Sequence, residues 1–475
     1  MTSPQESRAA ELVEQGRLAF NALDFQAAEA ALTEALTHEP SCVPALVGMG
    51  RIRSRRYHDF DGAQCYFDAA VAFQPNNPDL WINRAQNARF RGDRSSAVAD
   101  AKAVIAQNPL MSRAYKILDA CDIIEINDKY YKNLENIIIS PFVADIERAS
   151  AHFVLGEIHE RSAEYNRAFA HFQCANEFRR EALDARARNQ SHSFLQQAWR
   201  QALPLPVVGT RADAPRMIFV VGMPRSGSTL LEQILTTRPG VQSVGEASFF
   251  RRLWSETVQE CYGETLTRSS DAAALGRLLT VDRLTAVRDA YLDEVMSACP
   301  GGVADVVVDK QLSNYDIIPL LASIFPNSKI LHTTRHPLDV GMSCYSRDFA
   351  EIDFAARLTT IAEAYRSYAA TMSVWREYGF SNLFNVNYEK MATAPGGEIR
   401  RLLEFVELPF DEDATRPERS ANIVNTASAS QVKKPINTSA VARWKKYVDQ
   451  LEPLVIALGG WDWIEAHLRE NEAPA

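Results

Sequence analysis

Apolar residues in the N-terminal part of the chain recur at the same offsets with a period of about 34 residues. Three consecutive copies keep this register: Ala28, Leu32, Ala35 and Pro40, then Ala63, Phe67, Ala70 and Pro75, then Ala97, Ala101, Val104 and Pro109. After a degenerate but helical segment, 110–148, a further copy follows as Gly156, Ala168, Phe172 and Ala175. Small residues let paired helices approach closely, larger ones fill the seam, and proline ends the second helix. The pattern therefore predicts stacked helix pairs over about residues 9–184.

This pattern resembles tetratricopeptide repeats, with Gly16 at the small position of the first repeat and Trp81 at the aromatic position of the third. The resemblance implies an all-α solenoid over residues 1–184 that offers a concave surface to a protein or peptide partner. Five arginines are candidates to line that surface, or are solvated charges on a structural array: Arg53, Arg55, Arg56, Arg84 and Arg89. Residues 185–214 turn polar and then proline-rich, which predicts a last helix and a linker.

From residue 215 to residue 475, short β-branched runs alternate with helical patterns. Strands are expected at the run that ends in Phe219-Val220-Val221 and at Val303–Val308, Lys329–Thr333 and Leu383–Val386. Helices are expected at Leu278–Ala298, Asp316–Ile324, Val340–Ser346, Phe354–Tyr378 and Gly396–Val406. Alternating strands and helices predict a C-terminal α/β domain of the P-loop type, with a parallel sheet covered by helices. Ligands of such sheets bind at the carboxyl ends of the strands.

Composition narrows the functional classes. At 475 residues the chain is too long for one ordinary core, which agrees with two or more domains. The 51 basic against 60 acidic residues give a net charge of -9, which argues against a general nucleic-acid or anionic-membrane binder. The chain starts with polar and acidic residues and has no apolar run near the roughly 20 residues of a membrane span, so we expect a soluble cytoplasmic protein. Its seven cysteines form no C-x-x-C pair and are expected to be reduced.

The strand predicted at Phe219 leads into the chain's most informative loop. Gly222 and Gly227 have the G-x-x-x-x-G spacing of a phosphate-binding loop, and a leucine-rich helical segment follows. Backbone N–H groups of such a loop, together with the helix N-terminus, form an anion cradle. Nucleotide triphosphatases carry a lysine at the position of Ser228. The loop is therefore expected to hold a phosphate but not the γ-phosphate of a triphosphate.

A second anion-competent junction follows the strand predicted at Lys329–Thr333. Arg335 ends the strand, Pro337 suits the first turn of a helix, and Ser343 and Arg347 lie four residues apart further along it. We expect Ser343 and Arg347 to share one face of that helix.

Together these segments resemble the sulfotransferase superfamily, in particular the branch related to protein-tyrosine sulfotransferases. The 5′-phosphosulfate loop of the family is similar to Pro224, Arg225, Ser226, Gly227, Ser228 and Thr229, and its 3′-phosphate element to Arg335, Ser343 and Arg347. The resemblance implies 3′-phosphoadenosine 5′-phosphosulfate (PAPS) as donor, with PAP as product, which explains why the loop lacks a lysine. Proteins that join tetratricopeptide repeats to such a domain are familiar in bacteria.

The same resemblance, which spans about residues 217–444, assigns catalytic roles. Glu246 in Gly245-Glu246 is implied as the general base, and Arg225 and Lys310 as stabilisers of the bridging and sulfuryl oxygens. A late segment, 428–437, resembles the part of the family that closes over the donor, and implies that Ser428 and Lys434 complete this shell. Tyr388-Glu389 also matches the family and is interpreted mainly as scaffold.

Other interpretations remain open at this stage. Val306-Val307-Val308-Asp309 imitates a Walker B strand, which favours a P-loop kinase or NTPase, whereas Ser228 argues against one. A non-catalytic tetratricopeptide adaptor is a third alternative. For the acceptor, a protein tyrosine fits the branch resemblance, and a glycan or lipid-linked sugar hydroxyl fits the shared chemistry. No metal is implied, because His332 and His336 run from a strand into a loop and are expected to serve in packing or orientation.

Overall fold

The computed structural model describes residues 4–22, 24–187, 204–262, 279–299, 302–349, 352–420 and 435–472. By its internal contacts the chain divides into two compact units, one covering residues 1–179 and the other covering 180–422 and 426–475. We call them the repeat unit and the sheet unit, and describe each by itself.

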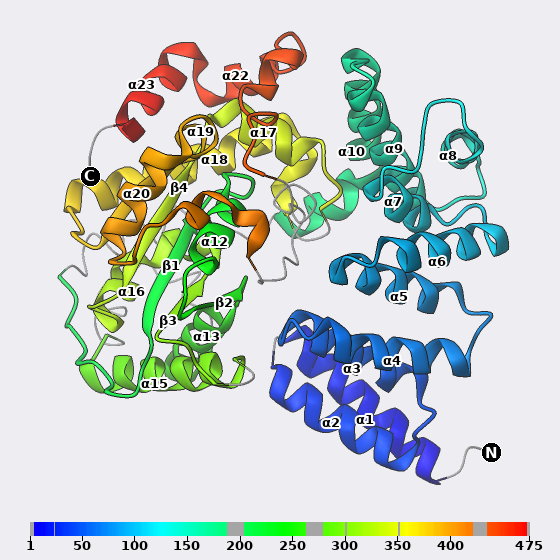
Figure 1. Cartoon of the computed structure of the whole chain (residues 1–475), viewed down its shortest axis with the longest axis horizontal. Helices are drawn as coiled ribbons and strands as arrows, with labels where there is room; N and C mark the ends of the chain where they lie inside the picture. Colours follow the sequence, from blue (N-terminus) through cyan, green and yellow to red (C-terminus); the bar gives the residue numbers. More distant parts are fainter. Residues whose placement is uncertain are drawn as a thin grey trace. The chain divides into compact units, whose positions relative to one another are not determined.

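The repeat unit is built of consecutive helices (Figure 1). They are α1 (Pro4–Asn21), α2 (Phe25–His38), α3 (Val43–Arg55), α4 (Phe60–Phe73), α5 (Pro78–Arg91), α6 (Arg94–Gln107), α7 (Ser112–Ala120), α8 (Lys129–Ile139), α9 (Asp145–Arg161) and α10 (Tyr165–Ala187). The second helix of the first three pairs begins after an aspartate whose carboxylate accepts a hydrogen bond from a backbone N–H of the first turn: Asp24, Asp59 and Asp93. The structure confirms an N-terminal helical array, with α7 and α8 in the degenerate segment.

Close helix contacts explain the small residues of the repeat. Leu32, Phe67 and Phe172 are nearly or fully buried in the seams of three helix pairs. Each lies against a glycine of the facing helix. A Cβ atom added at Gly16 would lie 2.7 Å from Leu32 Cγ, and one added at Gly156 would lie 2.4 Å from Phe172 Cε1. The helices therefore approach to a distance that only glycine allows.

The arginines predicted for a concave surface are engaged within the repeat unit. Arg53 pairs with Glu29 at 3.2 Å, and Arg84 makes two hydrogen bonds of 2.8 Å to the carboxylate of Asp100. Arg55, Arg56 and Arg89 place their guanidinium groups over aromatic rings. These contacts give the arginines a structural role, and docking of a partner at this surface stays a prediction.

The described strands of the sheet unit form one parallel sheet in the order β2-β3-β1-β4-β5. The strands are β1 (Arg216–Gly222), β2 (Val241–Gly245), β3 (Val306–Asp309), β4 (Lys329–Thr334) and β5 (Leu383–Asn387). Four of them match predicted strands within a few residues. The edge strand β2 was not predicted, because its sequence VQSVG carries two polar residues and ends in glycine.

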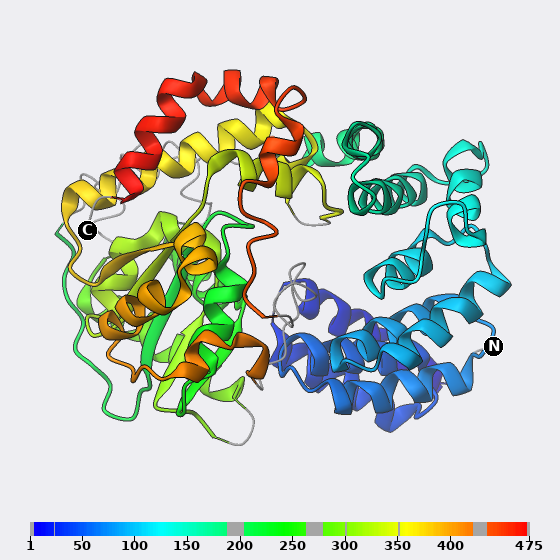
Figure 2. The ribbon, with the colours of Figure 1, turned by 45° about the horizontal axis from the view of Figure 1, so that its top comes forward.

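Helices cover both faces of the sheet, which confirms the predicted α/β class. They are α12 (Ser228–Thr236), α13 (Phe249–Tyr262), α15 (Val281–Ser297), α16 (Ile318–Ile324), α17 (Pro337–Tyr345), α18 (Leu358–Tyr378), α19 (Tyr388–Thr393), α20 (Pro395–Phe405), α22 (Glu452–Leu458) and α23 (Gly460–Glu472). The C-terminal helices α22 and α23, in red, run over α18, in yellow (Figure 2). No helix in the described parts of the chain has the length and apolar character needed to cross a membrane.

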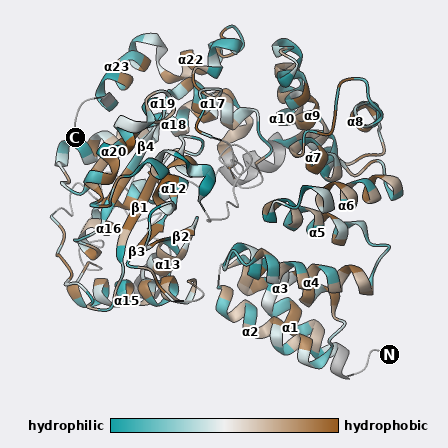
Figure 3. Cartoon of the chain, in the orientation of Figure 1, coloured by the Kyte–Doolittle hydropathy of each residue, from teal (hydrophilic) through white to brown (hydrophobic). Residues whose placement is uncertain are grey.

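Alternate residues of β1 serve the two faces. Ile218 and Val220 pack in one apolar cluster with residues of α12 and α20. Phe219 points the other way, into an aromatic cluster with Tyr291 of α15 and Phe325. All of β1 except Arg216 is buried, and Figure 3 shows the strand as a hydrophobic element inside the unit. A central strand that is buried on both faces fixes the position of the loop that follows it.

Candidate functional site

The loop after β1 is held tightly against the neighbouring strand. Its first glycine, Gly222, has φ +147°, and a Cβ there would lie 2.6 Å from Thr333 Oγ1. The Ser226 hydroxyl donates to the Met223 carbonyl at 2.6 Å and is hydrogen-bonded to the Thr333 hydroxyl at 2.5 Å. Arg225 adopts φ 70°, a left-handed conformation that few non-glycine residues adopt. The loop is thus a fixed structure built for close backbone approach.

The helix that follows begins without a side-chain cap. Gly227 is the N-cap residue of α12, with φ 99° and no side-chain hydrogen bond to the first turn. The side chains of Ser228 and Thr229 at the start of the helix are buried. Uncapped N–H groups and the helix dipole favour an anion at this end of α12.

Four arginines gather beside this helix end. Arg225 donates from Nε to the Ser343 hydroxyl at 2.9 Å. Burial first, and then the nearby charges of Arg347, Arg335 and Arg443, together lower the pKa of Arg225 to about 9. Because the positive charges of these arginines repel one another, a polyanion bound between them would be stabilised. The cluster joins all three residues predicted for the 3′-phosphate with the arginine of the loop.

One detail of this prediction was wrong. Helix α17 ends at Tyr345, so Arg347 lies beyond the helix and does not share a helical face with Ser343. It nevertheless remains close enough to Arg225 to influence its charge.

Arg335 is fixed from three sides. It donates from Nη1 to the Arg225 carbonyl at 2.8 Å and from Nη2 to the Ala440 carbonyl, and its guanidinium lies 4.5 Å from the ring centroid of Tyr388. The Arg335 side chain is buried, yet its Nε has no hydrogen-bond partner. Because a buried donor without a partner costs about 1–3 kcal/mol, this atom fits an anionic ligand. Tyr388, which we interpreted as scaffold, supports both this arginine and the loop, since a Cβ at Gly227 would lie 2.4 Å from its ring.

A second group of charges lies at the ends of β2 and β3. Lys310 follows β3 and is 0% exposed, and its Nζ donates to Glu246 Oε1 at 2.7 Å. Glu246 follows β2, and 54% of its side chain is exposed. A second carboxylate, that of Glu232 on α12, lies 3.7 Å from the same Nζ. Lys310 and Glu246 are therefore brought together, one buried and the other open to solvent.

Asp309 faces away from this group of charges. Its Oδ2 accepts a hydrogen bond from the buried Tyr291 hydroxyl at 2.8 Å, and its Oδ1 accepts one from the Gln311 N–H at 2.8 Å. Burial raises the pKa of Asp309 to about 7. The carboxylate that resembles a Walker B aspartate is thus hydrogen-bonded to Tyr291 and to the Gln311 backbone.

Two predicted site residues, Ser428 and Lys434, lie outside the described residues. The chain that resumes at residue 435 is anchored to α17. Asp339, which is 1% exposed, accepts hydrogen bonds of 2.8 Å from the N–H groups of Ala442 and Trp444. This anchor brings Arg443 to the arginine cluster. The two histidines serve in packing: His332 lies buried between Asn385 and Tyr368, and the ring of His336 stacks on Trp444.

Sequence analysis missed several contributors to the site. Glu232, Ser243, Asp339 and Arg443 are in contact with predicted site residues or near them, but none belongs to the motifs that were compared. Of these four, Glu232 carried a local signal, because it is a charged residue within the apolar helix segment LLEQIL. The others depend on contacts between distant segments.

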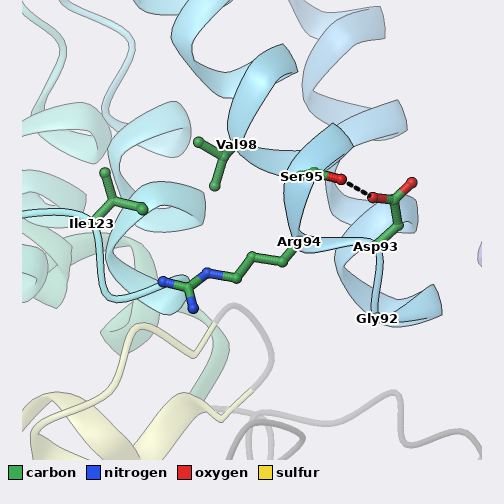
Figure 4. Close-up of a pocket in the computed structure, with 6 residues that line it drawn as sticks. All are labelled: Gly92, Asp93, Arg94, Ser95, Val98 and Ile123. Atoms are coloured by element: carbon green, nitrogen blue, oxygen red, sulfur yellow. Dashed lines mark hydrogen bonds between the residues drawn. The ribbon is translucent and has the colours of Figure 1, made fainter.

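A surface hollow of about 560 Å³ lies in the repeat unit, lined by Gly92, Asp93, Arg94, Ser95, Val98 and Ile123 (Figure 4). Its polar groups largely satisfy one another, since Ser95 donates to Asp93 at 2.8 Å and Arg94 donates to the Cys121 carbonyl. The hollow shares no residue with the charged groups of the sheet unit. We therefore assign the candidate site to the sheet unit alone.

Comparisons with known proteins agree with this assignment. Residues 215–412 match the model of the family described as "Sulfotransferase family". An uncharacterized protein of Aquifex aeolicus (strain VF5) is 31% identical over 353 residues, covering 69% of this chain and 44% of that protein. Protein-tyrosine sulfotransferase A of Caenorhabditis elegans is 25% identical over 242 residues, covering 48% of this chain and 60% of that protein. The chain thus spans about half the length of these curated relatives.

Among solved structures, the sulfotransferase domain from the Synechococcus PCC 7002 olefin synthase aligns with 52% of this chain and 97% of that domain, at 18% identity and a TM-score of 0.34. The family match is the informative result. The sheet unit contains a sulfotransferase-family domain, as the motifs of the sequence predicted.

Proposed function

With a sulfotransferase-family domain at residues 215–412 as premise, we propose that this protein transfers a sulfuryl group from PAPS to an acceptor hydroxyl. The strand order carries the proposal. Because the sheet runs β2-β3-β1-β4, the carboxyl edge presents Glu246, Lys310, the phosphate loop and Arg335 in that sequence. Residues suited to proton and sulfuryl chemistry therefore lie on one side of the loop, and residues suited to a further phosphate lie on the other.

The donor side is supported by the arginine cluster. The loop and the N-terminus of α12 would hold the 5′-phosphosulfate, and Arg335, Ser343 and Arg347 would hold the 3′-phosphate. The unpartnered Nε of Arg335 and the crowded guanidinium groups fit a ligand with two separate anionic groups. Arg443 adds a fourth cation that the motifs did not contain. PAPS supplies a sulfuryl group on a phosphate leaving group.

The chemistry requires one proton acceptor and several fixed cations. In the reaction, the acceptor oxygen forms a bond to sulfur, the bond between sulfur and the bridging phosphate oxygen breaks, and the acceptor proton passes to the Glu246 carboxylate. Arg225 and Lys310 would stabilise the negative charge that develops on the leaving phosphate and on the sulfuryl oxygens. As in phosphoryl transfer, positioning and electrostatic stabilisation would supply most of the rate enhancement.

For the acceptor we propose a tyrosine of a protein or peptide. Relatives named protein-tyrosine sulfotransferases support this choice, and the repeat unit offers a helical array of the kind that docks peptides. The exposed carboxylate of Glu246 leaves room for a bulky acceptor. Two arginines that follow Glu246 in the chain form ion pairs within the same unit. Arg251 pairs with Asp316, and Arg252 pairs with Glu294. A glycan hydroxyl is the alternative acceptor for the same chemistry.

A kinase or NTPase function is disfavoured by two observations. Ser228 stands where a phosphate-binding lysine is required, and the Asp309 carboxylate is hydrogen-bonded to Tyr291 instead of facing the loop. Calorimetry with PAP and with ATP plus magnesium separates the two functions. Tight PAP binding without metal supports the proposal, whereas a preference for ATP would overturn it.

Turnover then tests the assignment of the base. Transfer of radiolabelled sulfate from PAPS into host extract, separated into protein, glycan and lipid fractions, identifies the acceptor class. Glu246→Gln should lower kcat by about 10²–10⁴-fold, the usual contribution of general base catalysis. Glu256→Gln is the matched control, because Glu256 is similarly exposed and paired with Arg252 at 3.0 Å. Full turnover by the Glu246 variant would refute the assignment, and label absent from protein would refute the tyrosine acceptor.

A further inference from the structure

Lys310 has two carboxylate neighbours that differ in their exposure to solvent. The Glu246 carboxylate is largely exposed, whereas Glu232 is 3% exposed. The ammonium group itself is entirely buried. Burial of an ammonium group in a protein is costly unless an opposite charge is buried with it. Of these two carboxylates, Glu232 is the one that is buried with the ammonium group, and it remains there whether Glu246 is charged or protonated.

Glu232 is itself held in place. It lies on α12, four residues after Ser228, so the helix that starts at the phosphate loop also carries this carboxylate. Its Oε1 accepts a hydrogen bond from the Ser243 hydroxyl at 2.5 Å, which leaves Oε2 facing Lys310. Ser243 lies at the point where the register between β2 and β3 shifts.

The same irregularity positions Glu246. The Ser243 hydroxyl accepts a hydrogen bond from the Gly245 N–H at 3.0 Å, and the Gly245 carbonyl accepts one from the Lys310 N–H at 2.9 Å. The backbones that carry the base and the lysine are therefore tied to one another. The buried Glu232 and the partly buried Ser243 support this arrangement.

We propose that Glu232, held by Ser243, is a positioning residue that serves as the fixed counter-ion of Lys310. It holds the ammonium group in place and keeps it protonated when Glu246 leaves it to take the acceptor proton. This role deepens the proposed sulfotransferase function and rests on it. Neutralising Glu246 by a proton would otherwise leave Lys310 as a buried charge without a partner.

The electrostatics of the site agree with this geometry. Burial acts to lower the pKa of Lys310, but the charges of Glu232 and Glu246 more than offset it, and the pKa is raised. A third carboxyl group, Asp309, is adjacent in the chain and directed towards Tyr291. Lys310 thus depends on two carboxylates, one of which is the proposed base.

A double-mutant cycle tests the pairing without relying on activity. In Glu232→Gln the isosteric amide can still accept the Ser243 hydrogen bond, but the buried ammonium loses its fixed counter-charge. The melting temperature of the sheet unit should fall by roughly 5–10 °C. In the Lys310→Met background the same change should cost less than half as much, because no buried ammonium remains. Additive effects would overturn the proposal, since a merely structural Glu232 would destabilise both backgrounds equally.

Ligand binding supplies the second readout. The phosphates of PAP are fully ionised between pH 7.5 and pH 9.5, so changes in affinity over this range report on the protein. In Glu232→Gln the pKa of Lys310 should fall, and PAP binding at pH 9.5 should weaken by about tenfold beyond any change in the wild type. Any other group that titrates over this range does so in both proteins and cancels in the comparison.

Glu398→Gln is the control, because Glu398 is 5% exposed and pairs with Arg401 rather than with Lys310. It should show the pH dependence of the wild type. Parallel pH profiles for Glu232→Gln and the wild type would contradict the proposal. If the wild type does not bind PAP at all, the proposed function fails, and the thermal cycle alone decides whether Glu232 and Lys310 form a pair.

Discussion

Asp309→Asn should remove a large pH dependence from the stability of the sheet unit. The carboxyl group is 1% exposed, and burial raises its pKa to about 7 from an ordinary value of 3.8. Between these two values the folded chain keeps a proton that the unfolded chain has released. The free energy of unfolding must therefore decrease as the pH rises, by about 4 kcal/mol over the whole interval. Between pH 5 and pH 8 the expected loss is about 2.5 kcal/mol.

Asparagine has the shape of aspartic acid and does not titrate. Its amide can donate to the Tyr291 hydroxyl and its carbonyl can accept from the Gln311 N–H, so both contacts of the native carboxyl group survive in the variant. The difference in stability between wild type and variant should consequently change by about 2.5 kcal/mol between pH 5 and pH 8. Groups that titrate in both proteins cancel.

The measurement is urea denaturation at several pH values, followed by hydrogen exchange in peptides that contain β3. A local probe is needed because two units need not unfold together. Stability curves that stay parallel from pH 5 to pH 8 would refute the reasoning. The same variant distinguishes between functions: as a Walker B residue Asp309 would be indispensable for nucleotide hydrolysis, whereas sulfuryl transfer should retain at least a third of wild-type turnover.

Three further outcomes are expected. Gly227→Ala should lower the free energy of unfolding by about 2–4 kcal/mol and abolish PAP binding. The φ of 99° at this position and the Tyr388 ring, which would lie 2.4 Å from an added Cβ, both exclude a side chain. Thermal melting measures the first effect and calorimetry the second. Ser343→Ala should weaken PAP binding about tenfold, since Arg225 loses the hydroxyl that accepts from its Nε; unchanged affinity would exclude that role. Gly16→Ala should destabilise the repeat unit by about 1–3 kcal/mol, seen as faster hydrogen exchange in α1 and α2, with PAP affinity unchanged.

Local patterns were sufficient for most of the elements. The repeat register predicted which residues fill the helix seams, and Ala28, Leu32 and Ala35 are nearly or fully buried. The run of β-branched residues before Gly222 predicted the central strand. Both succeed because burial imposes a period on the sequence that matches the geometry of the element. The edge strand β2 has no such period, since three of its five residues are only partly buried.

In the candidate site, too, sequence patterns identified some of the residues, whereas their contacts came from the tertiary structure. Arg225, Arg335 and Ser343 were found from motifs, because each lies at a junction where a strand ends and a helix begins. Motifs also placed Asp309 beside Lys310, but adjacency in the chain did not reveal that one side chain faces Tyr291 and the other faces two glutamates. Successive residues at the end of a strand point to opposite faces of the sheet. The residues that they contact on each face belong to other segments of the chain.

By itself, then, the sequence determined the helical array, the parallel α/β class, the glycine-spaced loop without a lysine, and the identity of the charged residues around it. The tertiary structure alone decided which of those charges meet. The order β2-β3-β1-β4 placed Glu246 beside Lys310, and the packing of α12 against the sheet brought Glu232 within 3.7 Å of the Lys310 ammonium group. The reason is physical: periodicity records whether a residue is buried, whereas strand order and register determine its neighbour.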